Sequence, residues 1–398
     1  MKRAIVNISN EGAKYLIDGQ MWMYKNNVVN LDETIPNGQL VDIETLEGVY
    51  LGTGFLSKES HITVRILSKN RADQFDKNFY KQRIQFAYDF RKTIEPNNLT
   101  NCRLIFGEAD EFPGLVVDRY NDILVTQISS YGLDLIKDMV YEILLEVMHE
   151  NHQDVKAIYE RNDINVRTKE GLEQYKGFYK NNTMSPKTII NENGLKLHVD
   201  VENGQKTGYF LDQKDNRVLL RNMAHGKRVL DCFSHTGGFA LNAALGNASH
   251  VVSVDVSQTA LNQGYQNALL NGLEKKIEFK KADVFKYLDE CKPNTYDIIV
   301  LDPPAFTKSR KTINSAYNGY KNINMKAMKL LGKGGYLITC SCSRFMETAN
   351  FEKMLRESAQ EANVTLKQVS VTQQSHDHPI LWTMEETSYL KYYIFQII

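Results

Sequence analysis

An apolar strand runs directly into a glycine-rich loop at Val229-Leu230-Asp231-Cys232-Phe233-Ser234-His235-Thr236-Gly237-Gly238. Glycines let the backbone approach a ligand closely, and open α/β sheets bind ligands beyond the carboxyl ends of their strands. The loop lacks the Gly-x-Gly-x-x-Gly spacing that holds the pyrophosphate of nicotinamide dinucleotides, and it begins with an acidic residue instead. It therefore favours a cationic cofactor that carries an amino group and a sulfonium but no phosphate.

Two further acidic residues follow the next two predicted strands. Asp255 comes after the strand 250–254, and Asp283 follows the strand 276–280. A carboxylate at the first position can accept both hydroxyls of a ribose, and one at the second lies where an adenine amino group would be. Turn glycines alone occur in ordinary α/β proteins, but the two added acids indicate a nucleoside-containing cofactor.

Strands and helices alternate from about residue 186 onward. The pattern predicts a final strand over 389–398 and five earlier strands, over 228–232, 250–254, 276–280, 296–301 and 335–340. Helices of ordinary length fit between most of them. This alternation predicts an α/β domain over 186–398, with a parallel sheet covered on both faces.

Two further domains are predicted before this one, as the length of 398 residues suggests. Short alternating runs separated by turn residues predict a small β-barrel over residues 1–72. Residues 73–185 predict a mixed α+β domain, because helical patterns over 74–95 and 133–148 enclose two strands around an Asn-Asp turn.

Composition excludes several classes of protein. With 48 basic and 48 acidic residues the net charge is zero, so a nucleic-acid site must be a local patch. The five cysteines are an odd number without Cys-x-x-Cys spacing, which predicts a reducing cytoplasm and no zinc site. We expect no leader peptide and no membrane span. His376-Asp377-His378 has no evident third ligand, so we interpret it as a loop with hydrogen-bonding histidines and expect no metal.

A proline-stiffened loop follows the strand 296–301 and reads Leu301-Asp302-Pro303-Pro304-Ala305-Phe306. Its carboxylate stands at the carboxyl end of a strand, which is a common position for a site residue. A rigid loop with an acid and an aromatic ring can hold the edge of a nucleobase and stack on its face. The alternative is a turn without a ligand.

A pair of cysteines ends the strand 335–340, in Thr339-Cys340-Ser341-Cys342-Ser343. Pyrimidine C5 is a poor nucleophile, and a thiolate that adds to C6 makes C5 electron-rich enough to take a methyl group. Loss of the C5 proton then eliminates the thiol. The alternative is a buried structural cysteine, which is common. We favour the catalytic role for at least one of the two.

Positive charge gathers beside these two segments. Residues 305–346 contain no Asp or Glu and eight basic residues, which are Lys308, Arg310, Lys311, Lys321, Lys326, Lys329, Lys333 and Arg344. In a neutral chain, such a run favours contact with phosphates. The alternative is that part of the run is a solvated helix face.

The chain resembles, over its full length, the class I S-adenosylmethionine-dependent methyltransferases of 23S ribosomal RNA that form 5-methylcytosine. The resemblance also rests on Gly107-Glu108-Ala109-Asp110-Glu111-Phe112-Pro113-Gly114-Leu115-Val116-Val117-Asp118-Arg119-Tyr120 and on the segment 207–217. It implies a Rossmann-like methyltransferase domain preceded by an RNA-binding PUA barrel and the α+β domain. It also implies S-adenosylmethionine as the cofactor and ribosomal RNA as the partner.

The resemblance also implies the roles of individual residues. Cys342 is the expected nucleophile, because in such enzymes it follows a Gly-Gly strand and precedes Ser-x-x-x-Glu, here Gly334-Gly335 and Ser343 to Glu347. Cys340 is less favoured, and Asp302 is the second catalytic residue, which holds the cytosine N3/N4 edge. The expected cofactor contacts are Phe210, Gln213, Asp231, Phe233, Ser234, Thr236, Gly237, Asp255, Ser257, Asp283 and Asp302, flanked by Tyr209. The expected substrate contacts are Pro303, Pro304, Phe306, Lys308 and Arg310.

One departure keeps other functions open. Many RNA 5-methylcytosine enzymes carry a second cysteine where this chain has Ala305, so the base that releases the product is unidentified. Asp-Pro-Pro-aromatic loops also occur in enzymes that methylate guanine nitrogens, which is the second hypothesis. A non-catalytic RNA-binding assembly factor is the third. A homodimer stays open as an assembly state.

Overall fold

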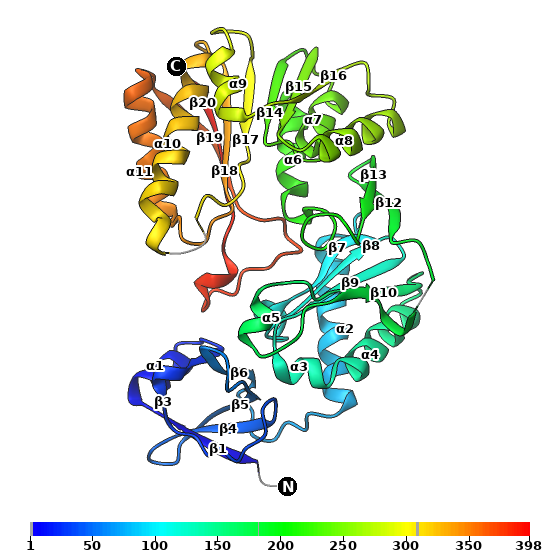
Figure 1. Cartoon of the computed structure of the whole chain (residues 1–398), viewed down its shortest axis with the longest axis vertical. Helices are drawn as coiled ribbons and strands as arrows, with labels where there is room; N and C mark the ends of the chain where they lie inside the picture. The colour runs from blue at the N-terminus through cyan, green and yellow to red at the C-terminus, as the bar shows by residue number, and fades with distance from the viewer. Residues whose placement is uncertain (1–2, 182, 308–309) are drawn as a thin grey trace. The chain divides into compact units, whose positions relative to one another are not determined.

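The computed structural model describes residues 3–181, 183–307 and 310–398, which form two compact units (Figure 1). The first unit runs to Ile190 and adds Val199–Leu211 and His376–Thr387. The second unit comprises Asn191–His198, Asp212–Ser375 and Ser388–Ile398. The division into domains at residues 72 and 185 stays a proposal. Among the described residues, no helix combines the length and the apolar character that crossing a bilayer requires.

The first unit begins with a six-stranded sheet in the order β2-β6-β5-β4-β1-β3. Its elements are β1 (Ala4–Ile8), α1 (Asn10–Ile17), β2 (Trp22–Tyr24), β3 (Val28–Asn30), β4 (Leu40–Thr45), β5 (Tyr50–Leu56) and β6 (Ile62–Ser68). The strands expected from the alternating runs correspond to β4, β5 and β6. Gly54 is required here, because a Cβ atom on it would lie 2.1 Å from the carbonyl oxygen of Arg65 in β6.

A five-stranded sheet in the order β11-β10-β9-β8-β7 completes the first unit. Its elements are α2 (Lys77–Ile94), β7 (Asn101–Phe106), β8 (Leu115–Tyr120), β9 (Ile123–Ile128), α3 (Tyr131–Leu135), α4 (Lys137–Glu150), β10 (Ala157–Arg161), α5 (Val166–Lys169) and β11 (Lys176–Phe178). The single helix predicted over 133–148 is wrong in one respect. The backbone leaves helical geometry at Ile136 (φ −108°, ψ 11°), which separates α3 from α4.

The second unit is built on a seven-stranded sheet in the order β16-β15-β14-β17-β18-β20-β19. Its strands are β14 (Arg228–Cys232), β15 (His250–Asp255), β16 (Ile277–Lys281), β17 (Ile298–Leu301), β18 (Tyr336–Ser341), β19 (Leu366–Thr372) and β20 (Lys391–Ile397). The first five in this order are parallel, and β20 is antiparallel to both β18 and β19. The six predicted strands are confirmed to within two residues, whereas the mostly exposed β19 was not predicted.

Helices cover both faces of this sheet, as the α/β pattern predicted (Figure 1). They are α6 (Lys214–Met223), α7 (Gly238–Leu245), α8 (Gln258–Leu270), α9 (Val284–Glu290), α10 (Ile313–Leu330) and α11 (Thr348–Ala362). Side chains of α9, α10 and α11 form one apolar core with β14, β15, β17 and β18. The hairpin of β12 (Lys187–Glu192) and β13 (Leu195–Asp200) straddles the division between the units. The strand order reverses between β14 and β17, where open sheets of this kind bind ligands.

Candidate active site

The loop after β14 holds an unusual backbone conformation. Phe233, His235 and Gly237 have φ angles of 61°, 49° and 77°, in the left-handed region that costs a residue with a Cβ atom free energy. Gly237 then begins α7 as its N-cap. Gly264 of α8 allows this loop to approach, since a Cβ atom there would lie 3.2 Å from the Thr236 carbonyl carbon. Such local strain is a feature of ligand-binding loops.

Asp231 is fully buried at the end of β14. Its Oδ2 accepts a hydrogen bond from the Ala240 backbone nitrogen at 2.9 Å, while Oδ1 has no partner among the described residues. Burial and, to a smaller extent, the negative charges of Asp302 and Asp255 together raise the pKa of Asp231 to about 8. A buried acceptor of this kind suits a cationic donor, because an unpaired polar atom in the interior costs free energy.

Asp255 organises the same loop from the end of β15. Its Oδ2 accepts from the His235 backbone nitrogen at 2.9 Å, and its Oδ1 accepts from the Ser257 nitrogen at 2.8 Å. Each carboxylate oxygen keeps a further lone pair for a ligand hydroxyl. The nearby Ser234 is buried, and its hydroxyl has no partner among the described residues.

Two of the expected cofactor contacts also act as helix caps. Ser257 accepts from the Ala260 nitrogen at 3.2 Å to cap α8, and Asp283 accepts from the Lys286 nitrogen at 3.1 Å to cap α9. Both side chains are exposed. Ser and Asp are favoured N-caps, so their position just before each helix was a signal for this role. The capping contacts leave their roles toward a cofactor as a proposal.

Asp302 lies just beyond β17 and is held by a chain of side chains. Gln213 Nε2 donates to Asp302 Oδ1 at 3.1 Å, and Asn216 Nδ2 donates to Gln213 Oε1 at 2.7 Å. Thr372 Oγ1 in turn donates to Asn216 Oδ1 at 2.6 Å. Burial and, to a smaller extent, the negative charge of Asp212 together raise the pKa of Asp302 to about 7. A substantial fraction of this carboxyl is therefore protonated at neutral pH.

The two cysteines of the segment 339–343 differ in environment. Cys340 is fully buried in β18, and burial raises the pKa of its thiol well above the ordinary value. Cys342 lies one residue beyond the end of β18 and is partly exposed. Its Sγ lies 4.0 Å from the carbonyl oxygen of Pro303, the residue after Asp302. The structure thus brings Cys342 and the Asp302 loop together at the carboxyl edge of the sheet.

The remaining substrate candidates have varied surroundings. Phe306 is half-buried and packs on Tyr320 of α10, with ring centroids 4.6 Å apart. Its described ring contacts also include Phe233 and Phe285, so Phe306 fixes the loop against these rings. Pro303 is buried and Pro304 is exposed. Lys308 and the side chain of Arg310 lie outside the described residues.

The basic run after residue 305 is partly neutralised. Lys321 forms ion pairs with Glu357 and Glu361 of α11, at 3.5 and 2.7 Å. Lys326 pairs with Asp289 of α9 at 2.7 Å. Acidic residues from neighbouring helices therefore meet lysines that the sequence showed without local partners. The predicted phosphate-binding charge is smaller than the run of eight suggested.

Two predicted cofactor neighbours belong to the other unit. Tyr209 and Phe210 lie in the segment Val199–Leu211 of the first unit. There Tyr120 Oη donates to the Tyr209 carbonyl oxygen at 2.8 Å. Thr207 Oγ1 donates to Asp118 Oδ2 at 2.6 Å and anchors the same segment. The role of Phe210 toward a cofactor stays a prediction.

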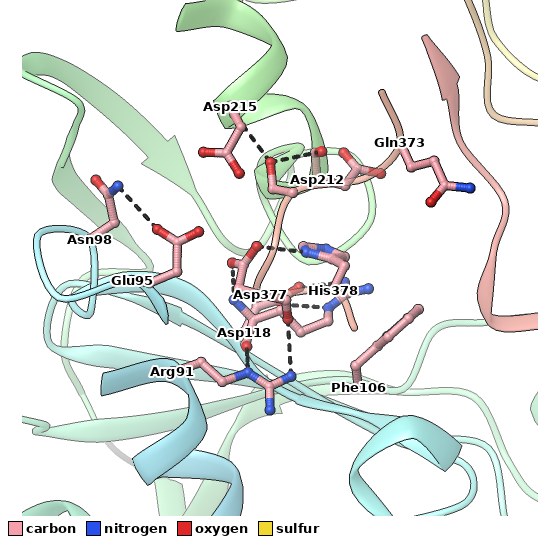
Figure 2. Close-up of polar contacts among 12 residues, drawn as sticks. Arg91, Glu95, Asn98, Phe106, Asp118, Asp212, Asp215, Gln373, Asp377 and His378 are labelled. Carbon is pink, nitrogen blue, oxygen red and sulfur yellow. Dashed lines mark hydrogen bonds and ion pairs between the residues drawn. The ribbon is translucent and has the colours of Figure 1, made fainter. Parts of the chain in front are cut away.

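The His-Asp-His motif holds the segment 376–387 to the first unit by hydrogen bonds (Figure 2). Asp377 Oδ1 lies 3.0 Å from His378 Nδ1, and Asp377 Oδ2 accepts from the Arg103 backbone nitrogen at 2.8 Å. Arg91 Nη2 donates to the Asp377 carbonyl oxygen at 3.0 Å. The hydrogen-bonding loop predicted from the sequence is confirmed for His378.

Sequence reasoning missed three residues of the site. Asn216 of α6 supports Gln213; it lies in the segment 207–217 but was not named as a site residue. Arg217 binds Glu192 through Nη1 at 2.9 and 3.0 Å, and its charge lowers the pKa of both Asp231 and Asp302. Lys391 is buried at the start of β20, where it pairs with Ser341 of β18. A buried lysine is rare, but burial cannot be seen in the sequence.

Comparisons with known proteins agree with this fold. The sequence profile of S-adenosylmethionine-dependent methyltransferases matches residues 180–395, and that of PUA-like domains matches residues 6–69. Proteins named ribosomal RNA large subunit methyltransferase I are similar over nearly their whole length. The one from Aliivibrio fischeri (strain MJ11) is 38% identical over 95% of both chains. The one from Shewanella denitrificans (strain OS217) is 40% identical over 93% of both.

Solved structures show the same fold. A candidate S-adenosylmethionine-dependent methyltransferase from Streptococcus mutans has a TM-score of 0.83 at 23% identity, covering 99% of this chain and all of that one. A candidate methyltransferase complexed with SAH has a TM-score of 0.84 at 24% identity, covering both chains completely. At this identity the likeness concerns the fold.

Proposed function

Because the chain belongs to the family of S-adenosylmethionine-dependent methyltransferases, we propose that it methylates C5 of a cytosine in 23S ribosomal RNA. Its relatives carry the name of large-subunit ribosomal RNA methyltransferases at 38 to 40% identity. We also propose the cytoplasm as its compartment, since the cysteines of the described residues form no disulfide.

The acidic groups around the 229–238 loop fit the cofactor. S-adenosylmethionine supplies the methyl group when it is bound, and it carries a sulfonium and an amino group. The unpartnered Oδ1 of Asp231 can accept from that amino group, and the free lone pairs of Asp255 can accept from ribose hydroxyls. Gly237 lets the backbone approach the ligand. Asp283, at the start of α9, can accept from an adenine amino group through its second oxygen.

Cys342 and Asp302 act on the cytosine in the proposed mechanism. The Cys342 thiolate adds to C6, and the bonding electrons move toward C5, which then takes the methyl group. Asp302 in its protonated form donates to N3 and accepts from the N4 amino group, so that it stabilises the negative charge that the addition develops. A water molecule or a basic side chain then takes the C5 proton, the electron pair of the C5–H bond restores the C5–C6 double bond, and the C6–S bond breaks to release the Cys342 thiolate. Pro303 and Pro304 keep the Asp302 loop rigid.

One observation carries this proposal. The partly exposed Cys342 lies 4.0 Å from Pro303, next to a carboxyl whose pKa is near neutrality. A guanine N-methyltransferase needs no thiol at this position, and an assembly factor needs neither group. The pairing of a reachable thiol with a proton-donating acid at the carboxyl edge therefore favours the covalent reaction on cytosine.

The decisive test is the identity of the methylated nucleoside. Protein-free 23S RNA is incubated with the chain and methyl-labelled S-adenosylmethionine, digested to nucleosides and separated by chromatography. We expect the label in 5-methylcytidine. A labelled guanosine derivative would establish the second hypothesis instead, and failure to bind S-adenosylmethionine would support the assembly factor. The same assay on large-subunit particles shows which form of the RNA is accepted.

We expect Asp231→Asn to raise the stability of the fold and to weaken the binding of the cofactor. The folded chain keeps this carboxyl protonated up to about pH 8, whereas the unfolded chain ionises it near pH 4. Folding therefore takes up a proton in this range, and the stability of the wild type falls as pH rises through it. We expect the variant to melt a few degrees higher than the wild type at pH 8, with a smaller difference at pH 5.

Binding of the cofactor by Asp231→Asn should weaken at the same time. Loss of the anionic form removes a charge-assisted hydrogen bond, so we expect an increase of about 10-fold in the Kd for S-adenosylmethionine at pH 8. Calorimetric titration at pH 6 and pH 8 measures both proteins. The wild type should bind more tightly at pH 8, and equal affinity of the two proteins at that pH would contradict the role of Asp231.

A further inference from the structure

A buried lysine stands beside the proposed nucleophile. Lys391 begins β20 and pairs with Ser341 in the antiparallel ladder between β18 and β20. Its Nζ donates to the carbonyl oxygen of Ser343 at 2.7 Å. The side chain thus crosses from β20 to the turn that follows β18, on which Cys342 lies.

The surroundings of this amine are unusual. Lys391 is 8% exposed, and among the described residues no carboxylate forms an ion pair with it. Burial lowers the pKa of Lys391 to about 8, and the charge of Cys342 opposes this shift. Buried lysines are generally paired, because an isolated ammonium in the interior is costly. The nearby group that can supply a negative charge is the Cys342 thiol.

We propose that Lys391 activates Cys342 by taking its proton and holding the sulfur as a thiolate in an ammonium–thiolate pair. The Sγ–H bond breaks, its electron pair stays on sulfur, and the Nζ lone pair forms the new N–H bond. Lys391 is thus a positioning residue that acts through Cys342. The inference deepens the proposed function, since the covalent reaction on cytosine requires this thiolate. It also gives a role to a lysine at a position where an apolar residue would pack at lower cost.

Other titratable groups near the pair do not replace Lys391. Tyr320 of α10 accepts from Ser341 Oγ at 3.1 Å, and burial raises the pKa of its hydroxyl, so it stays neutral. Asp302 would repel a thiolate when ionised, and its raised pKa limits that effect near neutrality. Cys340 is buried as a neutral thiol. Lys391 is therefore the group in this set that can stabilise negative charge on sulfur.

The test measures thiol reactivity and needs neither RNA nor methyl transfer. The full chain is alkylated with iodoacetamide between pH 5.5 and 9.5, and the rate at Cys342 is read by peptide mass spectrometry. Cys291 is the internal reference, because it is the other free cysteine that is not buried. We expect a wild-type midpoint below the value of about 8.5 for a free thiol. In Lys391→Met the midpoint should rise by about one pH unit, with a rate at pH 7 about 10-fold lower.

Two variants serve as controls. Lys391→Arg keeps a positive charge and should retain a low midpoint for Cys342. Lys326→Met removes a lysine that pairs with Asp289 on α9, and the pH midpoint and the alkylation rate of Cys342 should stay as in the wild type. Unchanged reactivity of Cys342 in a folded Lys391→Met protein would overturn the proposal. A wild-type midpoint at or above that of a free thiol would also overturn it, and this measurement needs no variant. A reactive, lysine-dependent Cys342 in a chain that makes no 5-methylcytidine would uphold the pair and refute the proposed function.

Discussion

We expect Cys342→Ala to lower the rate of methyl transfer to RNA by about 10⁴-fold or more, since removal of a covalent nucleophile has effects of this size. Without a thiolate at C6, the C5 carbon of cytosine is too weak a nucleophile to take the methyl group. The affinity for S-adenosylmethionine should change little, because the acidic groups proposed to hold it remain. Single-turnover transfer of labelled methyl, with cofactor binding measured in parallel, separates the two effects.

Cys340→Ala is the matched control. Cys340 is fully buried within β18, two residues before Cys342, so its loss should lower the melting temperature and leave most of the activity. A small cavity of this kind destabilises by about 1 to 2 kcal/mol. If Cys340→Ala abolished transfer in a folded protein while Cys342→Ala remained active, the assignment of the nucleophile would be wrong. Equal activity of both variants would indicate a reaction that needs no thiol.

Much of the second unit could be predicted because its signals are local. The strands β14, β15, β17 and β18 are short apolar runs, and parallel strands must be covered by the helices between them. Their order brings the loops after β14 and β17 and the end of β18 to one edge. The position of the candidate site could therefore be predicted before any side chain was placed. Strand β19 was not predicted, because most of its residues are exposed to solvent.

What could not be predicted depends on contacts between distant segments. The lysine run beyond residue 305 appeared unpaired until α9 and α11 brought their acids to Lys321 and Lys326. Lys391 follows Cys342 by 49 residues in the sequence, and the pairing of β18 with β20 brings the two close. The raised pKa values of Asp231 and Asp302 likewise follow from burial, which composition does not reveal.

Asp302→Asn should reduce the rate of transfer by about 10² to 10⁴-fold, the range that a general acid contributes. An asparagine can still donate to N3 and accept from N4, so binding of the RNA should change far less than kcat. It cannot deliver a proton, however, and the charge that develops on the ring when Cys342 adds is left without its stabilising group. The chain from Thr372 through Asn216 to Gln213 can hold the amide in place, since Gln213 Nε2 donates equally well to an amide oxygen.

The pH dependence distinguishes an acid from a simple hydrogen-bonding group. The pKa of Asp302 is raised to about 7, so the protonated form dominates below that pH and is lost above it. If protonated Asp302 is the active form, the wild-type rate should fall as pH rises beyond about 7, and this falling limb should disappear in Asp302→Asn. A wild-type rate that keeps rising to pH 9 would mean that the ionised carboxylate is the active form. Asp302 would then orient the cytosine through its N4 amino group alone, and the proton for N3 would have to come from another donor.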